Sequence, residues 1–154
     1  MLRAIVYDGP GKLVVRDVPK PQVGTDYLLI RVKAAGICGS DLELARGLRP
    51  DVKPPRIPGH EISGEVTEVG SRVTRFKAGD RVVVEPIISC GTCRNCIVGR
   101  YNICRDLKFM GVHTDGAFAE FLAVPEYRVY RIPRDLPYDA AAVLEPTAVG
   151  VHIV

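Results

Sequence analysis

The sequence contains no long apolar segment. Its first residues, Met1 to Tyr7, enter a strand-like pattern at once, without the apolar core of roughly 7–15 residues that a secretion signal needs. No stretch approaches the roughly 20 apolar residues of a membrane helix. Lysine and arginine are scattered and the formal net charge is only +3, so neither nucleic acid nor a membrane is an expected partner. We expect a cytoplasmic protein.

The sequence also lacks an even set of cysteines. It has five, and four of them lie between Cys90 and Cys104. In a chain without a secretion signal, such crowding indicates a metal site rather than disulfides. With 154 residues, of which 47% are hydrophobic and 25% charged, the chain is suited to one compact soluble domain.

Apolar residues alternate in several short segments that are separated by glycine and proline. This pattern predicts a mainly β protein with short helices, closer to a sandwich or barrel than to a βαβ fold. The strands are expected at 3–7, 12–18, 27–35, 62–69, 79–85, 117–124 and 127–132, and short helices at 41–46 and 137–143. Pro146 is expected to interrupt the second helix near Glu145, because the residue before a proline is disfavoured in helical conformation.

A thiol, an imidazole and a carboxylate form the central candidate site. Cys38 follows a strand, and His60 and Glu61 follow a proline-rich segment at 50–58 that we expect to be a surface loop. Ser40 and Glu43 fit a capping box, which places Cys38 just ahead of a helix N-terminus, where thiol pKa values fall. A thiolate, an imidazole and a carboxylate can bind Zn²⁺ and leave one coordination position open, as catalytic zinc requires. Taken alone, Cys38 would be interpreted as a small buried residue.

A second site has the pattern C-x2-C-x2-C-x7-C. Its surroundings contain few apolar residues, so a closed zinc site with four cysteine ligands could supply about 10 kcal/mol of folding free energy. An iron–sulfur cluster is the alternative, but the ferredoxin spacing has three residues before the last cysteine and a proline after it. Nearby basic residues are expected to offset the negative charge of the four thiolates. The four ligands are Cys90, Cys93, Cys96 and Cys104, and the basic residues are Arg94, Arg100, Arg105 and Lys108.

The motif G-H-E-x2-G-x5-G-x2-V, which begins at Gly59, and the upstream segment 36–41, GICGSD, resemble the zinc-containing medium-chain alcohol and polyol dehydrogenases, such as sorbitol and threonine dehydrogenases. The resemblance covers residues 3–154 and implies their N-terminal catalytic domain, a GroES-like, partly open β-barrel. A four-cysteine zinc lobe is expected at about 86–108. A helical segment at about 138–154 would lead to a Rossmann domain, whose Gly-rich dinucleotide motif this sequence lacks.

The resemblance implies roles for individual residues. A catalytic zinc would be held by Cys38, His60 and either Glu61 or Glu145, and Ser40 matches the hydroxyl that relays the proton. The zinc of the four-cysteine lobe would be structural. Many relatives have His where this chain has Glu43 and an aromatic residue where it has Leu44, so proton exit and the substrate wall are expected to differ. His113 is expected in a turn, and His152 is expected to pack among apolar residues.

The predicted function is the zinc-binding part of an NAD(P)-dependent dehydrogenase that acts on an alcohol, a polyol, a sugar or a threonine-type amino alcohol. Hydride would pass from a zinc-bound hydroxyl to NAD or NADP, which binds only with the missing domain, so the chain alone is expected to be inactive. The alternative is a non-catalytic zinc-binding GroES-like module that pairs with another chain. A metal-free GroES-type assembly protein is a third, weaker hypothesis, and homo-oligomerisation is left open.

Overall fold

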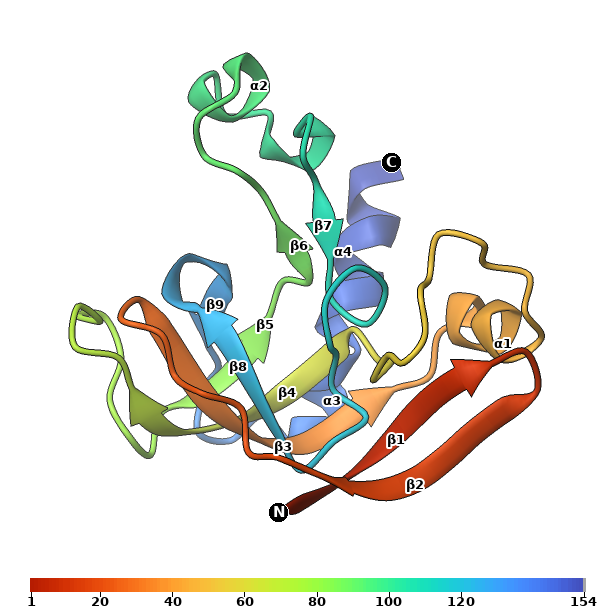
Figure 1. The fold of residues 1–154 in the computed structure, drawn as a ribbon. Coiled ribbons are helices and arrows are strands. Elements are labelled where there is room, and N and C mark those ends of the chain that lie inside the picture. Colours follow the sequence, from red (N-terminus) through yellow and green to blue (C-terminus); the bar gives the residue numbers. More distant parts are fainter. Residues whose placement is uncertain (154) are drawn as a thin grey trace.

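The computed structural model describes residues 1–153 (Figure 1). Its elements follow one another as many short strands and few helices, which confirms the prediction of a mainly β fold. The strands are β1 (Leu2–Gly9), β2 (Lys12–Val18), β3 (Tyr27–Gly36), β4 (Glu61–Val69), β5 (Arg81–Val84), β6 (Ile87–Ile88), β7 (Lys108–Phe109), β8 (Phe121–Pro125) and β9 (Val129–Arg131). The helices are α1 (Gly39–Ala45), α2 (Arg94–Ile97), α3 (Tyr138–Ala142) and α4 (Leu144–Ile153), with 3-10 turns η1 (Tyr101–Ile103) and η2 (Glu126–Arg128).

The central sheet has five antiparallel strands in the order β8-β3-β4-β5-β9. The β1–β2 hairpin is a separate two-stranded sheet. It is joined to the segment before β8 by a bridge between Ala4 and Ala119, and by the amide of Ile5, which donates to the carbonyl of Phe118 at 2.7 Å. The sheets therefore form the partly open barrel that the sequence predicted.

The main core lies on the central sheet. Most of its members are aliphatic side chains from alternate strand positions, because successive side chains of a strand point to opposite faces. Leu28, Ile30, Ile62, Val66, Val82, Val84, Val124 and Val129 are almost fully buried. A smaller cluster of Tyr7, Leu44, Val52 and Val112 packs beneath α1. Leu44 is thus a core residue rather than a residue that lines a substrate site.

Two features of this fold set the position of the candidate site. Strand β3 ends at Gly36, which pairs with Glu61 at the start of β4. The chain then enters α1, so Cys38 lies close to the beginning of β4, next to His60 and Glu61. The segment from β6 to β7 projects away from the sheet as a lobe that carries α2 and η1, and α4 stands beside the base of this lobe (Figure 1).

Several local predictions were wrong. Helix α1 begins at Gly39, so its N-cap is Cys38 rather than Ser40, and the side chain of Asp41, not Glu43, reaches back to the N-cap amide. The segment 50–58 is not purely superficial, since Val52 and Pro58 are buried. Residues 117–120 do not continue the strand that follows them.

Pro146 does not end the C-terminal helix. It lies in the first turn of α4, where the missing N–H of proline would be unpaired in any case. Only a turn at Val143 separates α3 from α4. His152 is exposed on α4 rather than packed, whereas His113 lies in a turn, as expected. Among residues 1–153, no helix combines the length and the apolarity needed to cross a membrane.

Candidate metal centres

The side chains of Cys38, His60 and Glu61 converge at the junction of β3, α1 and β4. One ligand atom from each residue lies within 4.8 Å of the ligand atoms of the other two. Two ligands of a single zinc ion, at about 2.3 Å for sulfur and 2.0 Å for nitrogen, are at most about 4.3 Å apart. Small side-chain rotations would therefore let the three groups share one ion. His60 and Glu61 are only 5% and 9% exposed, and buried ionisable groups need such a partner.

Asp41 lies beside this cluster and approaches two of its residues, Cys38 and His60. Its Oδ2 accepts a hydrogen bond of 3.0 Å from the amide of Cys38, and its Oδ1 lies 3.9 Å from Nδ1 of His60. Asp41 is itself buried. A carboxylate beside the non-ligating nitrogen of a histidine fixes the orientation of the ring and makes the other nitrogen a better ligand. The edge of His60 also packs against the ring of Phe109, with the ring centroids 5.1 Å apart.

Gly36 provides the space that Glu61 occupies. A Cβ atom at position 36 would lie 1.8 Å from Oε2 of Glu61, so the carboxylate would have to move away. Gly59 has a φ of +94° and lies against the ring of Phe118, a backbone conformation that side chains with L configuration rarely adopt. The backbone at Gly36 and at Gly59, next to Glu61 and His60, is therefore closely packed.

Glu145 lies near this cluster but is not one of its three converging residues. Burial raises the pKa of Glu145, and the negative charge of Glu61 raises it further. The two carboxylates are thus close enough to interact. Ser40 is half-buried in the first turn of α1, two residues after Cys38.

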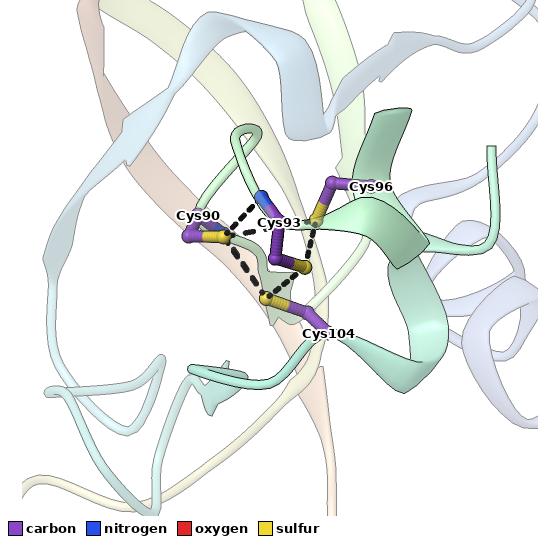
Figure 2. A group of neighbouring side chains, drawn as sticks. All are labelled: Cys90, Cys93, Cys96 and Cys104. Carbon is purple, nitrogen blue, oxygen red and sulfur yellow. Dashed lines mark hydrogen bonds between the residues drawn. The ribbon is translucent and has the colours of Figure 1, made fainter. Parts of the chain in front are cut away.

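The four cysteines of the lobe surround a common centre (Figure 2). The Sγ–Sγ separations are 3.9 Å between Cys90 and Cys96, 3.5 Å between Cys93 and Cys96, 3.9 Å between Cys93 and Cys104, and 3.5 Å between Cys90 and Cys104. Tetrahedral thiolates around one zinc ion are about 3.8 Å apart. All five cysteines of the chain are unpaired. This donor set fits a closed four-thiolate zinc site.

Backbone amides face the sulfur atoms of the lobe. The amides of Cys93 and Cys90 donate to the sulfurs of Cys90 and Cys104, both at 3.3 Å. Amides of Thr92 and Cys93 lower the pKa of Cys90 to about 6, whereas burial raises the pKa of Cys96 to about 11. No arginine or lysine side chain within residues 1–153 hydrogen-bonds to these sulfurs, whereas backbone amides do.

A cavity of about 670 Å³ lies between α4, the end of β5 and the lobe. Its polar lining includes Glu85, Tyr101, Tyr130, Glu145 and His152, and its apolar lining comes largely from β5, β6 and α4. Because Glu145 interacts with Glu61, the cavity adjoins the Cys38 cluster. A mostly apolar cavity with a few convergent polar groups is the usual form of a small-molecule site.

The structure brings together Cys38, His60 and Glu61, which the sequence offered as candidate ligands, but two neighbouring residues were missed. Asp41 was considered only as the last residue of the segment 36–41. Its position three residues after Cys38 is the N3 position of α1, from which an acidic side chain can cap the helix. Glu85 and its partner Arg128 gave no signal, because they are 43 residues apart and meet only in the folded sheet.

Comparison with known proteins agrees with this architecture. Residues 24–134 match the family model described as the alcohol dehydrogenase GroES-like domain. The chain is 42% identical over 155 residues to sorbitol dehydrogenase of Bacillus subtilis, covering 98% of this chain and 44% of that protein. It is 43% identical over 139 residues to L-threonine 3-dehydrogenase of Shewanella frigidimarina, covering 88% of this chain and 41% of that protein.

A crystal structure gives the same result. A Sinorhizobium meliloti protein, assigned as a zinc-binding dehydrogenase and solved with bound NADP, superimposes with a TM-score of 0.93 at 42% identity, over 99% of this chain and 44% of that one. The chain thus spans less than half the length of these relatives. The match over residues 24–134, together with the partly open barrel and its lobe, establishes that the chain belongs to the family of alcohol dehydrogenase GroES-like domains.

Proposed function

We propose that this chain is the zinc-binding catalytic portion of an NAD(P)-dependent dehydrogenase that oxidises a secondary alcohol, a polyol, a sugar or an amino alcohol. The observation that carries the proposal is the convergence of Cys38, His60 and Glu61 near Glu145, which lines the cavity. Three mixed ligands around one ion leave a position for substrate, whereas four thiolates do not. The names of the relatives, sorbitol and threonine dehydrogenases, support the same substrate classes.

Zinc at the first centre would act as a Lewis acid that lowers the pKa of the substrate hydroxyl. We assign Cys38, His60 and Glu61 as its protein ligands, with Asp41 orienting His60. Glu145 is proposed as a neighbouring carboxylate rather than the third ligand, because it lies outside the converging group. Its raised pKa suits a group that exchanges protons with bound water.

Ser40 is proposed to relay the proton from the substrate hydroxyl. Its hydroxyl is free of the capping role that Asp41 performs. We assign Cys90, Cys93, Cys96 and Cys104 to a structural zinc that holds the lobe in shape. Thiolate ligands require a reducing environment, which supports a cytoplasmic location.

The nicotinamide would be bound by a Rossmann domain outside residues 1–154. The sequence has no Gly-rich turn between a strand and a helix that could hold a pyrophosphate. We therefore propose that residues 1–154 form one GroES-like domain, that α4 leads toward the dinucleotide domain, and that the chain without that domain does not turn over substrate.

Metal analysis and steady-state kinetics test the proposal. The chain should contain two zinc ions, and Cys38→Ser should retain only the one in the lobe. The full-length gene product should reduce NAD⁺ or NADP⁺ with at least one member of a panel of sorbitol, threonine and secondary alcohols, and Cys38→Ser should abolish this activity. Full zinc and dinucleotide occupancy without oxidation of any alcohol or sugar would refute the enzyme assignment.

One observation favours a second candidate, a zinc-binding module that pairs with another chain. Helix α4 has no buried residue, and Val149, Val151 and Ile153 are 53%, 73% and 79% exposed. A helix that is apolar on all sides is normally covered. Sedimentation analysis of the full-length product separates the candidates: a module needs a second chain to bury α4, whereas the dehydrogenase buries it within its own chain.

A further inference from the structure

Glu85 directly follows β5, the strand that pairs with β4, whose first residue Glu61 belongs to the proposed catalytic centre. Strands β4 and β5 pair through Ile62 with Val84 and Ser63 with Val83. Beyond this register, the amide of Glu85 donates to the carbonyl of Arg128 at 2.9 Å. Glu85 also lines the cavity that Glu145 lines.

The side chain of Glu85 is only 22% exposed, so its carboxylate needs a compensating cation. Glu85 has one, because Nη1 of Arg128 donates to its Oε2 at 2.9 Å. Arg128 is only 4% exposed. Its Nη2 donates to Oγ of Ser89 at 2.7 Å, and its guanidinium lies 4.1 Å from the ring centroid of Tyr101. This arginine therefore cannot easily turn away, and it fixes the carboxylate of Glu85 in one orientation.

The other oxygen of Glu85 is unused. The hydroxyl of Tyr130 donates to Oε2 at 3.1 Å, as Arg128 does. Among residues 1–153 no hydrogen bond reaches Oε1. The side chain is 22% exposed and forms part of the cavity wall. An ionised carboxylate oxygen accepts hydrogen bonds and cannot donate one, so Oε1 suits a ligand group that carries an O–H or N–H.

We propose that Glu85 is a specificity-determining residue, whose Oε1 accepts a hydrogen bond from a second donor group of the substrate, away from the reacting hydroxyl. The inference rests on the proposed dehydrogenase function and deepens it. Substrates with a second hydroxyl or an ammonium group are favoured over simple alcohols, because only they satisfy this oxygen. Arg128 is a positioning residue that acts through Glu85.

Glu85→Gln tests the proposal with little risk to folding. The amide oxygen can still accept from Arg128 and Tyr130, while an NH2 group replaces Oε1 and faces the donor of the substrate. The probes are 2-butanol, 2,3-butanediol and 3-amino-2-butanol, assayed with the full-length gene product. The variant should lose about 10–100-fold in kcat/KM for the diol and the amino alcohol, as expected for a hydrogen bond to a charged group. The value for 2-butanol should change less than about twofold.

Asp26→Asn is the matched control. Asp26 also accepts from an arginine, with Nε of Arg72 at 2.8 Å, but it lies on the exposed surface and does not line the cavity. Its substitution should leave the ratio of kcat/KM between diol and 2-butanol unchanged. An equal loss for all three probes in Glu85→Gln would show a purely structural role, and an unchanged ratio would show that Oε1 does not contact substrate. Either result overturns the proposal.

A binding measurement separates this proposal from the proposed function. Saturation-transfer NMR of 2,3-butanediol with the zinc-loaded protein should give a signal that Glu85→Gln removes and Asp26→Asn retains. Equal signals from both variants overturn the role of Glu85 even if the enzyme turns over. Loss of the signal in Glu85→Gln supports that role even if no alcohol is oxidised, in which case only the dehydrogenase assignment fails.

Discussion

Gly36→Ala should empty the proposed catalytic zinc site while leaving the fold largely intact. The new Cβ would lie 1.8 Å from Oε2 of Glu61, and the carboxylate would have to retreat by about 1.6 Å to an ordinary separation of 3.4 Å. Metal–ligand distances tolerate only about 0.2 Å. The flexible end of Glu61 takes up most of the displacement, so we expect a loss of about 1–2 kcal/mol in the free energy of unfolding. Zinc affinity at this site should fall by about 100-fold.

The assay is zinc analysis by mass spectrometry after dialysis against chelators of increasing strength, with urea unfolding in parallel. Gly39→Ala is the matched control, since a Cβ at position 39 meets no atom within 4 Å. Gly39 lies in α1, where alanine is the better helix former, so this variant should keep both zinc ions and lose no stability. If Gly36→Ala retained two zinc ions with unchanged affinity, Glu61 could not be a ligand at that centre.

Three further predictions concern the two centres. Asp41→Asn should weaken zinc binding at the first centre by about 10–100-fold, because the charge 3.9 Å from Nδ1 of His60 is lost; calorimetric titration of the zinc-free protein measures this, and unchanged affinity would exclude an orienting role. Cys104→Ser should leave one zinc per chain and abolish amide-exchange protection in the lobe alone, whereas global loss of protection would show that lobe and sheet fold as one unit. In zinc-free protein, iodoacetamide should alkylate Cys90 before Cys96, since their pKa values are about 6 and about 11. The thiolate fraction of Cys90 should therefore rise steeply between about pH 5 and 7, and peptide mass spectrometry that found Cys96 first would contradict this order.

The strands and the candidate metal ligands could be predicted from the sequence because alternation and short motifs are local patterns. Alternation of apolar residues marks β1 to β4, and the cysteine spacing of the lobe restricts the geometry to a four-thiolate site. The start of α1 was placed too late, because Ser40 is a good N-cap in isolation. In the folded chain the bend at Cys38 uses Asp41 instead.

What the sequence by itself determined is the mainly β character of the chain and the two groups of candidate ligands, since these follow from short motifs and a short period. Only the tertiary structure decided that Glu61 converges with Cys38 and His60 while Glu145 stays beside them. Only the folded sheet brings Glu85 to the cavity that Glu145 also lines, where Arg128 orients it. Such contacts depend on strand register and helix placement, because these bring together residues that are distant along the chain, and no local pattern records them.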